Sequence, residues 1–215
     1  MPSALSLKHI TVSFNGNRLF DDFSLTVPKG ARTIILGKSG TGKSTLLQMA
    51  LGYVIPDTGS IQVNDIQLTG STVWEIRKQI SYVSQNVTLG RGTVRNHMDR
   101  VFNFKANSHI TPSANELDEL YDYFELPHDI RDQEIHLLSG GEKQRIALVT
   151  ALLLKRPLLF LDEVTSALDP ALKTKTIDRT LACEDCTVVV VSHDGIWLER
   201  DNIKVFDLKE NQWIR

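Results

Sequence analysis

Apolar and polar residues alternate in several short stretches near the start of this chain, which is typical of β-strands with one buried face. The first two stretches cover residues 10–14 and 23–27, and the turn-forming sequence Asn15-Gly16-Asn17 follows the first. Two more strands are predicted over 61–64 and 78–84. The pattern therefore predicts four strands in the first part of the chain, apart from a buried one described next.

Continuous apolar runs mark a second kind of strand, which is buried on both faces. Three such runs cover residues 33–36, 158–161 and 187–191. Residues 205–208 are predicted to form a last strand at the edge of the same sheet. Strands that are apolar on both faces are typical of a parallel sheet covered by helices.

Helices are predicted between these strands. They cover residues 43–50, 93–101, 114–124 and 142–155, and Asp169-Pro170 supplies the cap and the first residue of another. Alternating strands and helices predict an α/β domain with a largely parallel central sheet.

The segment 86–137 is less regular and more polar than its surroundings, and we interpret it as a small helical subdomain. The whole chain, 1–215, is then a single domain, with a catalytic core formed by 1–85 and 138–215. Neither an internal repeat nor a linker interrupts the sequence.

Composition and charge narrow the possible functions. The 215 residues include 24 Lys and Arg against 26 Asp and Glu, so the formal net charge is −2 and no nucleic-acid partner is expected. A membrane span needs about 20 apolar residues, and the longest largely apolar runs are far shorter. With no leader segment at its start, the chain is expected to be cytoplasmic, and a membrane role would require a partner.

A glycine-rich segment follows the apolar run 33–36 and opens the helix 43–50. Its sequence matches the pattern G-x-x-x-x-G-K-[ST] with the residues Gly37, Lys38, Ser39, Gly40, Thr41, Gly42, Lys43 and Ser44. Glycines let backbone N–H groups curve around phosphate oxygens, and the helix N-terminus adds partial positive charge. The context predicts a nucleotide site in which Lys43 reaches the β- and γ-phosphates and Ser44 binds Mg²⁺.

Two carboxylates follow the apolar run 158–161. Because ligands bind beyond the carboxyl ends of parallel strands, Asp162 is expected near the phosphate loop, where it could bind Mg²⁺ directly or through water. Glu163 is the candidate general base that polarises the attacking water. The alternative is that both residues only cap the loop after the strand.

A second glycine-rich segment has the sequence Leu138-Ser139-Gly140-Gly141-Glu142-Lys143-Gln144-Arg145 and resembles the signature motif of ABC ATPases. A hydroxyl, glycine N–H groups and a helix N-terminus make another anion-binding surface. In this family the signature contacts nucleotide held by a partner domain. The resemblance therefore implies head-to-tail pairing with a second copy or a related ATPase subunit.

Other family elements match in order along the chain. Gln85 resembles the Q-loop glutamine, residues 166–169 resemble the D-loop, and His193 resembles the switch histidine that hydrogen-bonds the γ-phosphate. Phe14 stands where the family often has an aromatic residue that stacks on adenine. Simpler alternatives stay open: Gln85 as an exposed amide, Asp169 also as a helix cap, His193 as a structural histidine and Phe14 as a core residue.

The resemblance extends from about residue 5 to about 208 and implies a P-loop ABC ATPase domain with a RecA-like parallel-sheet core, an antiparallel β subdomain and a small helical subdomain. It implies ATP and Mg²⁺ as cofactors. Hydrolysis is assigned to Lys43, Gln85, Glu163 and His193, and Mg²⁺ binding to Ser44, Gln85 and Asp162. The residues expected to bind ATP are Phe14, Gly37, Lys38, Ser39, Gly40, Thr41, Gly42, Lys43, Ser44, Thr45, Ser139, Gly140 and Gly141.

These features predict the ATP-binding subunit of an ABC transporter, peripheral on the cytoplasmic face of the membrane. It would drive a separate integral membrane permease that docks on the segment 86–137 near Gln85. A soluble ABC ATPase for cofactor assembly or cell-envelope remodelling is the alternative. Compact bacterial subunits proposed to export metal ions share the sequence of residues 138–145 and a segment like 165–169.

The pair Cys183-x-x-Cys186 has no further ligands at zinc spacing and precedes a strand, so no metal or redox role is expected.

Overall fold

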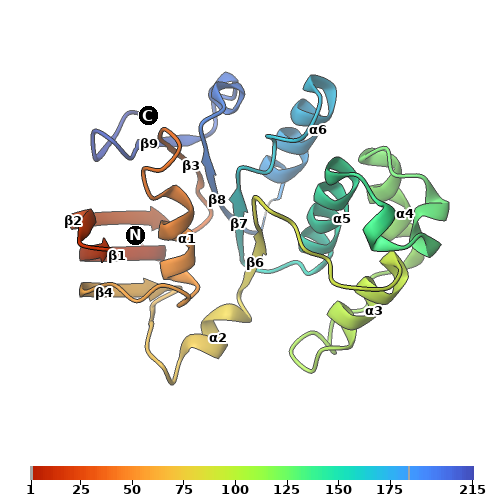
Figure 1. Cartoon of the computed structure of the whole chain (residues 1–215), viewed down its shortest axis with the longest axis horizontal. Helices are drawn as coiled ribbons and strands as arrows, with labels where there is room; N and C mark the ends of the chain where they lie inside the picture. The colour runs from red at the N-terminus through yellow and green to blue at the C-terminus, as the bar shows by residue number, and fades with distance from the viewer. Residues whose placement is uncertain (1, 184) are drawn as a thin grey trace.

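The computed structural model describes residues 2–183 and 185–215, which form two β-sheets with helices packed around them (Figure 1). The smaller sheet is antiparallel, with the strand order β2-β1-β4-β5. Its strands are β1 (Ser3–Phe14), β2 (Asn17–Pro28), β4 (Thr58–Val63) and β5 (Ile66–Gln67).

The larger sheet has the strand order β10-β9-β3-β8-β7-β6. All its neighbouring strands run parallel except β10, which pairs antiparallel with β9. The strands are β3 (Arg32–Leu36), β6 (Ile80–Val83), β7 (Leu158–Asp162), β8 (Thr187–Ser192), β9 (Lys204–Asp207) and β10 (Gln212–Trp213).

Helices cover both faces of the parallel sheet. Figure 1 places α1 between the two sheets and α5 on the opposite side, with α3 and α4 beyond it. Among the residues that the structure describes, no helix has the length and apolar character needed to cross a membrane. The α-helices are α1 (Lys43–Ala50), α2 (Val73–Arg77), α3 (Val94–Asn103), α4 (Ala114–Tyr123), α5 (Gly140–Leu153) and α6 (Pro170–Leu181), and the 3₁₀ turns are η1 (His128–Asp132), η2 (Ile135–Leu137) and η3 (Gly195–Glu199).

The parallel strands β3, β6, β7, β8 and β9 each contribute to two hydrophobic cores. On β8, Val188 and Val190 face the core formed with α5, while Val189 and Val191 face the core formed with α1 and the antiparallel sheet. Successive side chains of a strand point to opposite faces, so a strand that divides two cores needs apolar residues at every position. This explains the continuous apolar runs in the sequence.

The predicted α/β class and the predicted helices and buried strands are confirmed, with boundaries that differ by a few residues at most. The first strand begins earlier than predicted, at Ser3, because an irregularity between Leu7 and Ile10 interrupts the alternation. No residue pattern predicts α2 or the two-residue strands β5 and β10.

One strand prediction is wrong in its position. The segment 205–208 was expected at the sheet edge, but β9 pairs with both β3 and β10. The short strand β10 therefore occupies that edge. A pairing partner of only two residues has no periodic pattern, so β9 resembles an edge strand in the sequence.

Cys183 and Cys186 form a disulfide in the loop before β8. The carbonyl of Cys183 accepts a hydrogen bond from the guanidinium of Arg32, at the start of β3. The pair thus lies at the amino end of the parallel strands, opposite the end at which the phosphate loop follows β3.

Candidate functional site

The phosphate loop connects β3 to α1, and two of its glycines adopt backbone conformations that other residues rarely take. Gly40 and Gly42 have φ angles of 81° and 95°, in the left-handed region that favours glycine. A Cβ added at Gly42 would lie 2.8 Å from the ring of Phe20. The sequence folds into this tight loop because both the conformation and the available space require glycine.

The loop forms one wall of a cavity of about 600 Å³. Residues from five separate parts of the sequence meet there. The lining residues are Phe14, Leu19, Lys38, Ser39, Gly40, Gly42, Lys43, Ser44, Thr45, Gln85, Glu163 and His193. All of these except Leu19 were predicted site residues.

The side chains of Lys43 and Thr41 donate hydrogen bonds to the backbone of the loop. The carbonyl of Gly37 accepts a hydrogen bond from Lys43 Nζ at 2.7 Å, and Thr41 Oγ1 donates to the carbonyl of Lys38 at 2.9 Å. The carbonyl of Lys38 also accepts from Lys43 Nζ at 3.0 Å. The loop therefore holds its lysine through its own backbone.

A buried carboxylate joins the lysine to the predicted switch histidine. Glu163 Oε1 lies 3.2 Å from Lys43 Nζ, and Glu163 Oε2 lies 2.8 Å from His193 Nδ1. Glu163 and Lys43 are 6% and 5% exposed. Glu163 has a φ of 51°, so the chain turns sharply directly after β7. A buried charge needs a partner, and here the predicted base has two basic side chains within ion-pair distance.

Asp162 accepts one hydrogen bond on each carboxylate oxygen. Ser44 Oγ donates to Oδ1 at 2.8 Å, and Tyr82 Oη donates to Oδ2 at 3.1 Å. Burial raises the pKa of Asp162, and the two donors oppose that rise. The pKa of the Tyr82 phenol lies well above its usual value, because of burial and the nearby carboxylate.

Oxygen donors lie in and beside this cavity. Ser44 and Gln85 line it with a hydroxyl and an amide, and the Asp162 carboxylate, which is not part of the lining, accepts the hydrogen bond of the Ser44 hydroxyl. Hard cations such as Mg²⁺ prefer such donors. Within residues 2–183 and 185–215, no cluster of three His, Cys, Asp or Glu side chains could hold a metal. A cation held by Ser44, Gln85 and Asp162 would therefore need further oxygen ligands from a phosphate or from water.

Tyr82 is the contact that sequence reasoning missed. It lies on β6 opposite Phe160 of β7, on the face that packs against α1. Asp162 follows Phe160 by two positions and so projects from the same face. The sequence does show a tyrosine three positions before Gln85. Its contact with Asp162 could not be predicted without the register between β6 and β7.

Phe14 lies at the cavity and outside the core. Its side chain is 46% exposed, whereas Ile10 and Val12 on the same strand are buried. The core-packing alternative for Phe14 is therefore wrong. An exposed ring at the edge of a cavity is available for stacking on a planar ligand.

The predicted signature residues lie away from this cavity in the described chain, since Ser139, Gly140 and Gly141 are absent from its lining. Ser139 instead caps α5. Glu142 Oε2 accepts hydrogen bonds from the backbone N–H of Ser139 at 2.8 Å and from its hydroxyl at 2.7 Å. These two hydrogen bonds lower the pKa of Glu142.

Asp169, in the predicted D-loop, is confirmed as a helix cap. Its Oδ1 accepts hydrogen bonds from the backbone N–H groups of Ala171 and Leu172, both at 3.0 Å. The D-loop also lies close to the signature helix, since a Cβ added at Gly141 would lie 3.5 Å from the carbonyl of Ala167.

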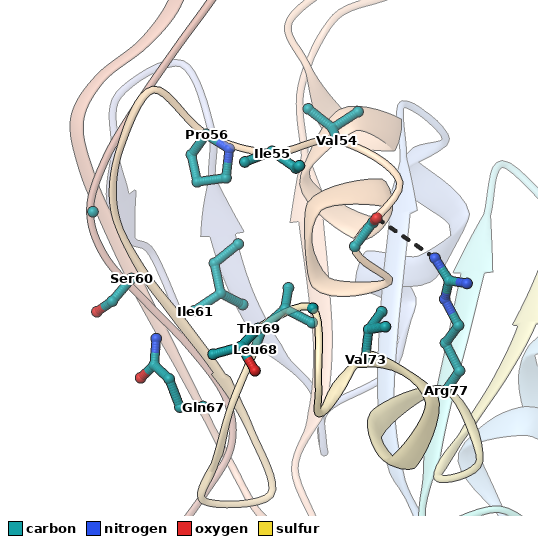
Figure 2. Close-up of a pocket in the computed structure, with 13 residues that line it drawn as sticks. Val54, Ile55, Pro56, Ser60, Ile61, Gln67, Leu68, Thr69, Val73 and Arg77 are labelled. Atoms are coloured by element: carbon teal, nitrogen blue, oxygen red, sulfur yellow. Dashed lines mark hydrogen bonds between the residues drawn. The ribbon is translucent and has the colours of Figure 1, made fainter.

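A second cavity, of about 320 Å³, lies between the end of α1, the β4–β5 hairpin and α2 (Figure 2). Its lining is mostly apolar, and the guanidinium of Arg77 lies over the rings of Tyr53 and Trp74. None of the predicted site residues lines this cavity. The phosphate-loop cavity is therefore the candidate active site.

Comparison with known proteins is consistent with this site. Residues 20–166 match the protein family described as "ABC transporter". The chain is 36% identical over 199 residues to "Fe(3+) ions import ATP-binding protein FbpC" of Pseudomonas fluorescens, covering 89% of this chain and 55% of that protein. It is 37% identical over 183 residues to "Energy-coupling factor transporter ATP-binding protein EcfA1" of Bacillus licheniformis, covering 81% of this chain and 63% of that protein.

The fold also occurs in solved structures. The cbiO1 protein from Clostridium perfringens, titled as part of the ABC transporter complex cbiONQ, superposes with a TM-score of 0.77 at 24% identity. The alignment covers 100% of this chain and 88% of cbiO1. The chain spans less than two thirds of the length of the two curated relatives above. The expected antiparallel β subdomain and parallel-sheet core are thus confirmed as an ABC ATPase fold.

The glycine requirement at position 42 leads to a stability prediction. We expect Gly42→Ala to lower the free energy of unfolding by about 1–3 kcal/mol, because alanine would be strained at this φ and would contact Phe20. Urea unfolding measures the change. Gly70→Ala is the matched control, since a Cβ there meets open space, and equal losses in both variants would contradict the prediction.

Proposed function

This chain belongs to the ABC transporter family, and on that premise we propose that it binds ATP with Mg²⁺ and hydrolyses it to drive a separate membrane permease. The observation that carries the proposal is the cavity in which Glu163 and His193 lie beside the phosphate loop and its Lys43. Phosphate-binding groups and a candidate base are then within reach of one bound nucleotide.

The residues present fit both ATP and Mg²⁺. Backbone N–H groups of the loop and the start of α1 suit phosphate oxygens, and Lys43 brings a positive charge to the same wall. Ser44, Asp162 and Gln85 would hold Mg²⁺ together with phosphate oxygens. The metal would neutralise charge that develops on the phosphates.

Each of the three side chains around the phosphate loop would have a separate task in hydrolysis. Glu163 would orient a water and accept its proton while the water oxygen attacks the γ-phosphorus. The bond from that phosphorus to the β–γ bridging oxygen breaks, and ADP and phosphate leave. Lys43 would stabilise charge on the phosphate oxygens, and His193 would contact the γ-phosphate while its Nδ1 stays close to Glu163.

Pairing of two copies would complete the site. Ser139, Gly140 and Gly141 present donors at the start of α5, and these residues do not line the cavity of their own chain. In a head-to-tail dimer they would contact nucleotide on the partner. The nearby Ala167 carbonyl supports a D-loop role beside this interface.

The permease would dock where the segment 86–137 meets the core. A hollow of about 220 Å³ there is formed by the loop after β6 together with α3 and α5, including Val87, Leu89 and Ala147. A hollow near Gln85 that is lined by both apolar and polar side chains suits a short helix of a membrane partner, and this chain would then sit on the cytoplasmic face. The relative from Pseudomonas fluorescens is named for the import of Fe(3+) ions, so it gives no support for export. Export of metal ions by this chain therefore stays a prediction.

Removing the loop lysine tests nucleotide binding. We expect Lys43→Ala to weaken ATP binding by about 100-fold, or ~2.7 kcal/mol, because a buried cation no longer faces the phosphates. Isothermal titration calorimetry gives the affinity. Lys29→Ala is the control, since Lys29 is an exposed lysine paired with Asp65, and unchanged affinity in Lys43→Ala would contradict the phosphate-loop assignment.

Removing the base tests the hydrolytic cycle. We expect Glu163→Gln to stop hydrolysis and to accumulate a dimer in Mg-ATP, because the amide keeps the shape but cannot accept the proton. Light scattering should show the mass doubling on addition of Mg-ATP. Glu125→Gln, an exposed glutamate paired with Lys175, should stay active, and a Glu163→Gln chain that remains monomeric in saturating ATP would count against the homodimer.

Co-purification tests the membrane partner. We expect tagged Glu163→Gln, held in Mg-ATP, to recover a polytopic membrane protein in stoichiometric amount from gently solubilised membranes. Mass spectrometry identifies the partner. Recovery of soluble proteins alone would overturn the permease proposal and favour the ATPase for cofactor assembly or envelope remodelling.

A further inference from the structure

The Tyr82 hydroxyl holds the second carboxylate oxygen of Asp162. Tyr82 Oη donates to Oδ2 at 3.1 Å, and Ser44 Oγ donates to Oδ1 at 2.8 Å. The two donors come from different elements, β6 and α1, which both precede Asp162 in the sequence by many residues and meet it only in the fold. Together they restrict rotation of the carboxylate plane.

The position of Asp162 makes this second donor important. Its side chain is 2% exposed, so bulk water has little access to it. A buried carboxylate oxygen without a donor loses its hydration without compensation. Removing the phenolic hydroxyl would therefore leave Oδ2 unpaired and free to rotate away from its present direction.

Tyr82 is well suited to hold a fixed direction because its ring is itself packed. The ring lies against the core that contains Phe160 and α1, and it is half-buried. Backbone pairing of Tyr82 with Phe160 fixes the strand register beneath it. The hydroxyl is thus supported by both strand pairing and side-chain packing.

Tyr82 also connects two of the candidate metal ligands. Gln85 follows it by three positions, at the point where β6 ends and the loop toward α3 begins. A displacement of β6 would move the Tyr82 hydroxyl, and with it Asp162, together with Gln85.

We propose that Tyr82 is a positioning residue that orients Asp162 toward Mg²⁺ and so sets the Mg²⁺ concentration at which nucleotide binds tightly. The inference rests on the proposed function and deepens it. Hydrogen-bond partners of metal ligands typically change metal affinity by 10–100-fold when removed. Tyr82 therefore acts on the metal through Asp162 and needs no contact with ATP.

The test removes one hydroxyl. Binding of a fluorescent, nonhydrolysable ATP analogue is measured in EDTA and across a Mg²⁺ titration, for the wild-type chain and for Tyr82→Phe. We expect Tyr82→Phe to need about tenfold more Mg²⁺ for half of the gain in affinity, with unchanged affinity in EDTA. Its ATPase rate should return to the wild-type level at saturating Mg²⁺.

Two further variants separate positioning from folding. Tyr123→Phe removes a tyrosine hydroxyl that donates to the carbonyl of Lys175 at 3.1 Å, away from the cavity, and it should keep the wild-type Mg²⁺ midpoint. Incorporation of 4-aminophenylalanine at position 82 keeps an N–H donor at the same place and should restore that midpoint. The 4-aminophenylalanine variant still tests the role of the donor at position 82 if the phenylalanine variant is unstable.

The outcomes distinguish this inference from the proposed function. A wild-type chain that fails to bind the analogue would overturn the proposed function and, with it, this inference. A wild-type chain with a clear Mg²⁺ effect and an unshifted Tyr82→Phe variant would overturn only the role of Tyr82. Equal weakening with and without Mg²⁺ would also overturn it, because that result indicates a general structural defect.

Discussion

The register of four parallel strands determines where every candidate catalytic group lies. Leu36 pairs with Ser192, and Asp162 pairs with Val191, so β3, β7 and β8 end side by side. Val83 pairs with Leu161 and brings the end of β6 to the same edge. Because the four strands end together, the phosphate loop, Glu163, the histidine and the glutamine line one cavity, and Asp162 lies beside it in contact with Ser44. A slip of one position would turn these side chains to the opposite face.

Burial makes the charges at this edge interdependent. Lys43, Glu163 and Asp162 are each less than a tenth exposed, and each is satisfied by groups from other elements. An unpaired charge in such surroundings is strongly unfavourable. A bound phosphate would therefore redistribute existing contacts of Lys43, and Glu163 would keep its contact with His193. The resting geometry links nucleotide entry to the surroundings of the candidate base.

Much of the fold and of the site was predictable from the sequence, for identifiable physical reasons. Strands buried on both faces are apolar without a break, as at 187–191, and glycine at position 42 is required by backbone geometry. What the sequence did not reveal depends on register or on very short elements. The contact of Tyr82 with Asp162 needs the pairing of two distant strands, and β10 is too short to carry a pattern. Phe14 needed its exposure before stacking could be preferred to packing.

The capping box at the start of α5 has a consequence for how that surface can meet an anion. Its hydroxyl and N–H donors on Ser139 are already engaged by the carboxylate of Glu142. A phosphate that binds these two Ser139 donors must exchange with a negative group of the chain itself. The free energy of such an exchange is a difference between two hydrogen-bonded states, so it is smaller than that of filling vacant donors. A contact formed by exchange is also easily reversed, since the displaced carboxylate remains tethered beside the donors and can return when the phosphate leaves.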